Sequence, residues 1–391
     1  MDRIYFDHNA TTRPDSTVRD AVVDALENLW GNPSSLHWFG QRVNALIEDA
    51  REAVARLINA DPAEIIFTSG GTEANNLAIM GAAFRDPGKR GRVITSTIEH
   101  PSVRSTVRNL ATHGINIVEV PVSGGGRVDP EAVAAAITDD TVLITIMAAN
   151  NETGMIQPIE EIGRTAKEHG VLFHTDAVQA AGKIKIDAQK WPVDMITIAA
   201  HKFYGPKGVG ALWLRRGLKI KPRQLGGGQE AGLRAGTENI PGIAGLGAAA
   251  RLASANLEKW SKHISGLRDL LEKQILARMP DAIVNGDPAH RVPNTTSISF
   301  MGAEGEAVAI NLDLKGIAVS TGSACSTGAN EPSHVLLAQG MTPRQAECAI
   351  RFSLGKDNTE AEVRRAIEAV TEAVAKVRSI SGGMAAAGGK R

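Results

Sequence analysis

The chain has 391 residues, and its 43 Lys and Arg balance its 43 Asp and Glu, so the formal net charge is zero. This balance argues against a strongly basic nucleic-acid binder and against a polybasic membrane-surface protein, and the length predicts two or three domains with a large core. Two cysteines, no apolar leader and no uncharged run of about 18 residues predict a cytoplasmic protein that requires no nucleic acid and no membrane.

Short apolar runs alternate with helical patterns over the first half of the chain. A run of this kind, bounded by turn residues, is typical of a strand that is buried on both faces. Six such strands are predicted, at residues 65–68, 93–95, 142–147, 171–173, 195–198 and 211–214. Helical segments lie between them, for example at 159–169, so the pattern predicts an α/β fold with a mostly parallel sheet.

The pattern changes after about residue 245. A long helix is predicted at about 248–279, followed by a half-exposed strand at 296–300 and by strands at 317–319 and 350–353. The Gly- and Ala-rich end is typical of a disordered tail. We therefore predict a large domain over 16–250, a smaller α+β domain built from 1–15 plus 251–380, and a disordered tail at 381–391.

Polar side chains follow five of the predicted strands, at the sheet edge where α/β proteins bind ligands. After the first strand, Gly70, Gly71 and Thr72 precede a helix, and free backbone N–H groups there favour a phosphate. An ordinary helix cap at Thr72 is the alternative interpretation. The other strand ends contribute His100, Asn151, Asp176, Gln179, His201 and Lys202.

A phosphate site, a carboxylate, a lysine and an imidazole on one sheet edge fit pyridoxal 5′-phosphate. In this interpretation Lys202 closes a Schiff base with the aldehyde, and Asp176 keeps the pyridine nitrogen protonated so that the ring accepts electrons. Gln179 is positioned for the ring hydroxyl, His201 donates to the phosphate, and His100 stacks on the ring and transfers protons. A solvated loop lysine is the alternative for Lys202.

Motifs in the same order along residues 5–353 resemble those of cysteine desulfurases of the NifS/IscS type, within the class-V aminotransferase family of fold-type I enzymes. The matching stretches are 6–12, 31–37, 68–73, 99–101, 150–154, 174–179, 201–208, 234–239, 322–325, 331–334 and 350–353. The stretches 234–239 and 285–288 look closer to the nitrogen-fixation branch. The resemblance implies an aspartate-aminotransferase-like fold with a large cofactor-binding domain and a smaller α+β domain.

The resemblance also implies roles for single residues. Lys202 carries the cofactor, and Gly71, Thr72 and His201 hold its phosphate, while Thr237 reaches the phosphate of the neighbouring subunit in a homodimer. Asn151 and Arg351 position the substrate, with Arg351 binding its carboxylate through a bidentate pair.

One position departs from the pattern of many relatives. Ala199 stands where they have a serine that donates to the phosphate, so one hydroxyl donor is lost. Backbone N–H groups near Ala200 are the expected substitutes.

The two cysteines differ in their surroundings. Cys348 lies in an apolar approach to a strand and is interpreted as core. Cys325 lies in a run of small residues that predicts an exposed loop, where a thiol is accessible and reactive. The resemblance implies that Cys325 takes sulfur from L-cysteine as a persulfide, leaving L-alanine. It then passes the sulfur to an iron–sulfur scaffold or another acceptor protein, with a transient iron–sulfur contact at Cys325 and nitrogenase maturation as one destination.

Three other functions stay open at this point. A selenocysteine lyase or cysteine-sulfinate desulfinase uses the same scaffold, although the long Cys325 loop favours the desulfurase. An aminotransferase has no use for Cys325. A non-catalytic assembly partner is the third alternative. The presence of four residues with chemical roles argues against it: Lys202, Asp176, His100 and Cys325.

Overall fold

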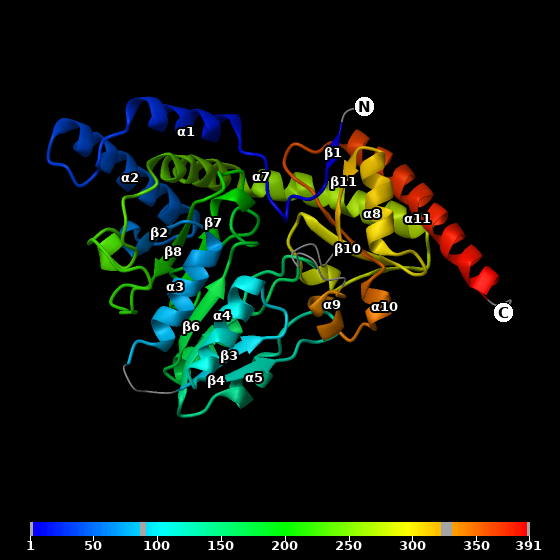
Figure 1. The fold of residues 1–391 in the computed structure, drawn as a ribbon, viewed down its shortest axis with the longest axis horizontal. Helices are drawn as coiled ribbons and strands as arrows, with labels where there is room; N and C mark the ends of the chain where they lie inside the picture. Colours follow the sequence, from blue (N-terminus) through cyan, green and yellow to red (C-terminus); the bar gives the residue numbers. More distant parts are fainter. Residues whose placement is uncertain (1–2, 87–90, 322–330, 389–391) are drawn as a thin grey trace.

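A computed structural model describes residues 3–86, 91–321 and 331–388 of the chain, so Cys325 lies outside the described residues. Figure 1 shows two bodies that share the long helix α7 (Ile240–Arg278). The helix begins before the predicted residue 248, because Asn239 caps it and Pro241 fits its first turn. In the part of the chain that the structure describes, no helix is both long and apolar enough to cross a membrane.

The larger body contains a seven-stranded sheet. Its strands are β2 (Ile65–Thr68), β3 (Arg92–Ser96), β4 (Asn116–Val120), β5 (Thr141–Thr145), β6 (Leu172–Asp176), β7 (Met195–Ala199) and β8 (Gly210–Leu214), in the order β2-β8-β7-β6-β5-β3-β4. All pairs are parallel except those of β8, which runs antiparallel to both β2 and β7. The predicted α/β class and mostly parallel sheet are confirmed, and the six predicted strands are present together with β4.

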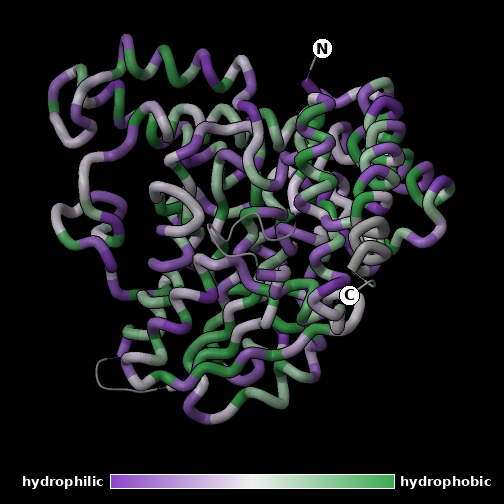
Figure 2. Tube along the Cα trace, turned by 45° about the vertical axis from the view of Figure 1, so that its right-hand side comes forward, coloured by the Kyte–Doolittle hydropathy of each residue, from purple (hydrophilic) through white to green (hydrophobic). Residues whose placement is uncertain are grey.

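Helices cover both faces of this sheet. They are α1 (Ser16–Asn28), α2 (Trp38–Leu57), α3 (Gly71–Ala83), α4 (Pro101–Thr112), α5 (Pro130–Ala136) and α6 (Ile159–Glu168), with the first half of α7. Adjacent residues of β7 show the arrangement: Ile196 packs in the cluster that includes α1, α2 and α7, whereas Met195 packs in the cluster with α3 and α4. Figure 2 shows hydrophobic residues gathered along these strands.

The smaller body combines an antiparallel sheet with helices. Its sheet has the order β12-β13-β10-β9, and β1 pairs with β11 in parallel. The elements are β1 (Ile4–Tyr5), β9 (Ala282–Val284), β10 (Thr295–Phe300), α8 (Gly305–Leu314), β11 (Ile317–Ala318), β12 (Ser320–Thr321), α9 (His334–Ala338), α10 (Pro343–Ala346), β13 (Ala349–Ser353) and α11 (Glu360–Gly388). Ile4 and Phe6 belong to its core together with Leu271 of α7 and Phe352 of β13. This division of the core supports the domain boundaries, which we keep as a proposal.

One prediction about this part of the chain is wrong. Strand β10 was expected to be half exposed, but all six of its residues are buried. Its polar members are buried because they are hydrogen bonded, for instance Ser297 and Ser299 to Asn285. Helix α11 continues to Gly388, and the disordered tail at 381–391 stays a prediction.

Candidate active site

A cavity of about 300 Å³ opens where strands of the large sheet end. It collects residues from both bodies that are far apart in the sequence. Nine of the predicted site residues line it: Gly71, Thr72, His100, Asn151, Asp176, Gln179, His201, Lys202 and Arg351. Thr237 is exposed and does not line the cavity, and Cys325 lies outside the described residues.

The turn between β2 and α3 brings the first turn of α3 to the cavity. Gly70 adopts φ +151°, which disfavours other residues, and a Cβ on Gly71 would lie 2.9 Å from Val178 Cγ2. Gly71 and Thr72 therefore present the start of a 13-residue helix to the cavity, where backbone N–H groups favour an anion.

Asp176 ends β6 and is held by two donors. The Asn75 side chain donates to its Oδ2 at 2.7 Å, and the backbone N–H of Val178 donates to its Oδ1 at 2.9 Å. Asn75 also donates to Ser102 Oγ at 2.8 Å. These bonds fix the orientation of the carboxyl group at the cavity. Sequence reasoning assigned no role to Asn75 or Ser102, although both line the cavity.

His100 is the N-cap of α4, and its Nδ1 accepts from the backbone N–H of Ser102 at 3.1 Å. Because Nδ1 accepts, the neutral ring carries its proton on Nε2. Burial lowers the pKa of His100, and the charge of Lys202 also lowers it, while Asp176 raises it. Burial likewise lowers the pKa of His201 to about 4. Both imidazoles are therefore neutral near pH 7.

Lys202 ends the short 3₁₀ turn that follows β7. Its Nζ donates to the backbone oxygens of Asn9 at 2.6 Å and of Ala10 at 2.8 Å. Asn9 is a third residue that the sequence analysis missed. Its side chain donates to the Asn151 backbone oxygen at 3.1 Å, so one residue connects Lys202 to the strand end that carries Asn151.

Arg351 reaches the cavity from β13 of the smaller body. Its guanidinium donates to Asp7 Oδ1 at 2.7 Å and to the Asn151 backbone oxygen at 2.9 Å. Its Nε is buried and has no hydrogen-bond partner. The group is therefore fixed by these contacts and keeps a donor for one more acceptor, such as a carboxylate.

Ala199 lies at the cavity, beside the start of α3. This residue lines the cavity, and its Cβ lies 3.6 Å from the position of a Cβ on Gly71. The backbone N–H of Ala200 itself donates to the Val209 oxygen at 3.2 Å, and compensation by the other N–H groups near Ala200 stays a prediction. The Ala200 N–H is used in pairing next to β8, because β7 and β8 run antiparallel there.

Two buried carboxyl groups flank the site, and sequence reasoning gave them no role. Burial raises the pKa of Glu99, next to His100, to about 8, and that of Glu152, next to Asn151, to about 7. Glu99 accepts from Ser96 Oγ and from the Met147 N–H. Among the described residues, no group of three or more His, Cys, Asp or Glu side chains is arranged to hold a metal ion.

The buried position predicted for Cys348 is confirmed. The residue is buried, and its Sγ donates to the Arg344 oxygen at 3.2 Å. It therefore serves as a natural comparison for Cys325.

Comparisons with known proteins agree with this geometry. The aminotransferase class-V family matches residues 4–366. A cysteine desulfurase of Trichormus azollae is 48% identical over 97% of this chain and 95% of its own length, and the cysteine desulfurase NifS of Azotobacter vinelandii is 45% identical over the same shares. A solved NifS-like protein superposes with a TM-score of 0.90 at 39% identity, covering 95% of this chain and 99% of its own. The chain therefore belongs to the aminotransferase class-V family, among the cysteine desulfurases of the NifS/IscS type.

Proposed function

We propose that the chain is a pyridoxal-phosphate-dependent enzyme that removes sulfur from L-cysteine and leaves L-alanine. The observation that carries this proposal is the single cavity that brings Lys202, Asp176, His100 and Arg351 together from both bodies. An amine, a carboxylate, a neutral imidazole and a guanidinium around one space are the groups that this chemistry needs.

The residues around the cavity fit the cofactor. The start of α3 at Gly71 would present backbone N–H groups to the phosphate, with Thr72 and His201 beside it in the cavity lining. Asp176 would hold the pyridine nitrogen and Gln179 the ring oxygen. When bound, pyridoxal phosphate supplies an aldehyde for an amine and a protonated ring that accepts electrons.

The chain's own groups perform the remaining tasks. Arg351 binds the carboxylate of L-cysteine through N–H donors, and Asn151 positions the substrate beside it. Lys202 Nζ moves the α proton, and His100 holds or releases a proton at Nε2, where burial keeps the ring neutral. The thiolate of Cys325 attacks the substrate sulfur, so that an S–S bond forms while the C–S bond breaks and L-alanine departs.

We further propose a homodimer in the cytoplasm. Thr237 lies on the surface of this chain and outside its cavity, as expected for a residue that serves the neighbouring subunit. Exposed aromatic and aliphatic residues support an interface: Trp30 stacks on Phe39 at 4.8 Å, and Leu36 and Leu225 are 92% and 82% exposed. Figure 1 shows the segments that carry them on one side of the molecule.

The sulfur acceptor is proposed to be an iron–sulfur scaffold or another acceptor protein. The transferred sulfur is proposed to serve iron–sulfur cluster assembly, with nitrogenase maturation as one use. A transient iron–sulfur contact at Cys325 belongs to this transfer step. The names of the NifS and IscS relatives support this part of the proposal.

The test uses the two cysteines as a matched pair. Cys325→Ser, loaded with pyridoxal phosphate and given L-cysteine, should retain the visible absorption of the cofactor but form no protein persulfide and no alanine above a trace. Cys348→Ser should form both at close to the wild-type rate, because Cys348 is buried away from the cavity. Peptide mass spectrometry locates the extra sulfur. Normal alanine formation by Cys325→Ser would overturn the assignment.

A further inference from the structure

Lys183 is a buried lysine that the proposed mechanism does not use. The preceding residue, Gly182, adopts φ +71°, which favours glycine. A Cβ at this position would lie 2.5 Å from Phe203 Cβ, so a side chain does not fit there. Burial lowers the pKa of Lys183 well below its usual value, and the charges of Lys202 and Arg351 act in the same direction. A buried amine is costly, which makes its contacts informative.

The amine of Lys183 donates to two uncharged amide oxygens. One is Gln179 Oε1 at 2.5 Å, and the other is Asn9 Oδ1 at 3.1 Å. Because Lys183 Nζ is the donor in both contacts, it binds the oxygen end of each carboxamide. The amide group of Gln179 is thereby fixed with Nε2 on the other side, where it donates to the Asn9 backbone oxygen at 2.9 Å.

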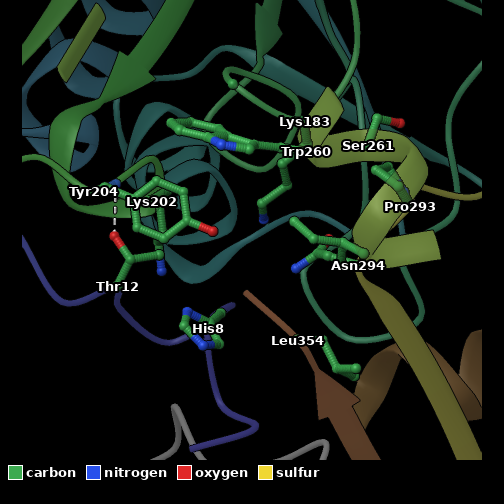
Figure 3. Close-up of a pocket in the computed structure, with 12 residues that line it drawn as sticks. His8, Thr12, Lys183, Lys202, Tyr204, Trp260, Ser261, Pro293, Asn294 and Leu354 are labelled. Carbon is green, nitrogen blue, oxygen red and sulfur yellow. Dashed lines mark hydrogen bonds between the residues drawn. The ribbon is translucent and has the colours of Figure 1, made fainter. Parts of the chain in front are cut away.

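A second, smaller cavity of about 20 Å³ lies beside this contact, and Figure 3 shows the amine end of Lys183 pointing toward it. Lys202 lines both this cavity and the larger one, so Lys183 lies behind the site and not in it. The titratable and charged groups near Lys183 are His8, Lys202 and Tyr204 at the small cavity, with Arg351 and His201 farther along the site.

We propose that Lys183 is a positioning residue, which holds the Gln179 carboxamide so that its NH₂ group, not its oxygen, faces the cofactor cavity. Gln179 Nε2 has two N–H bonds, and the Asn9 oxygen takes one of them. The other is left for the anionic ring oxygen of the cofactor. This inference rests on the proposed cofactor. Without the amine of Lys183 behind it, the Gln179 amide is free to turn and to present an acceptor to that oxygen.

The test is a double-mutant cycle with a spectroscopic readout. Wild type, Lys183→Met, Gln179→Leu and the double variant are loaded with pyridoxal phosphate, and their visible absorption is titrated with pH. Loss of the donor makes the ring oxygen more basic and stabilises the protonated neighbouring nitrogen. The midpoint should therefore rise by about one pH unit in each single variant. In the double variant it should rise no further, because Lys183 acts through Gln179.

The matched control is Lys185→Met, two residues away on the exposed surface, which should titrate as wild type does. Thermal melting of each cofactor-free variant checks folding. If Lys183→Met does not fold, Lys183→Gln replaces it, and this variant should shift the midpoint less than Gln179→Leu because its amide still donates.

Three results would separate the failures. The inference about Lys183 is overturned, and the proposed function is not, if Lys183→Met titrates as wild type does. The same holds if Lys183→Met shifts the midpoint as much in the Gln179→Leu background as it does in the wild type. A wild type that takes up no pyridoxal phosphate overturns the proposed function, and the inference falls with it.

Discussion

Replacing Arg351 with lysine tests how the site recognises its substrate. The side chain of Arg351 is only 3% exposed, and it keeps an unpartnered Nε while Asp7 and Asn151 hold its other nitrogens. Lysine preserves the charge beside Asp7 but offers no fork of parallel donors. At least one charge-assisted hydrogen bond to the substrate carboxylate is then lost, which costs about 1.5–3 kcal/mol.

This loss corresponds to an increase of about 10- to 150-fold in KM for L-cysteine. The value of kcat should change by less than about threefold, since the bond is present both before and during the reaction. Alanine formation at varied cysteine concentration measures both constants. Arg364→Lys, on the exposed face of α11, is the control. An Arg351→Lys variant with unchanged KM would refute this account of carboxylate binding.

Two further changes probe the cofactor pocket and a buried acid. Ala199→Ser restores a hydroxyl beside the start of α3, so the dissociation constant for pyridoxal phosphate, measured by equilibrium dialysis, should fall about fivefold, as one net hydrogen bond implies; unchanged affinity would place the phosphate elsewhere. Burial raises the pKa of Glu99 from 4.5 to about 8. Between pH 4.5 and pH 8 the folded state therefore holds a proton that the unfolded state has released. The free energy of unfolding consequently falls as the pH rises through this range. Glu99→Gln should flatten this fall in urea unfolding at pH 5 and pH 8, and an equally steep fall in the variant would contradict the role of Glu99.

Local patterns were sufficient to predict most of the large sheet. Runs such as Met195–Ala199 are buried throughout and apolar except for Thr197, because both faces of the strand are covered. Strand β4 was missed because it lies at the sheet edge, where Asn116 and Glu119 are exposed and interrupt the apolar run. The antiparallel direction of β8 was not predictable from its composition, since a buried strand has the same apolar composition whether it pairs in parallel or antiparallel.

The site was predictable where a side chain follows a strand directly, as Asp176 and Lys202 do. Residues that act through a neighbour left no such signal. Asn75 lies inside a helix, and Asn9 comes from a segment with little regular structure, so only the folded chain shows that they support Asp176 and Lys202. The hydrogen bond of the Ala200 N–H was also not predictable from the local sequence, because its acceptor is the backbone oxygen of Val209 on the neighbouring segment.

The pairing of β1 with β11 has a consequence for the order of assembly. Ile4 pairs with Ile317, and Asp7 with Ser353, so more than 300 residues of chain are synthesised between the partners. Closing so long a loop is slow. Asn9, which holds the Lys202 amine, is anchored through its N–H to Ser353 Oγ at 2.9 Å. The nascent polypeptide can thus build its larger sheet early, yet it stays inactive until translation has passed the last strand.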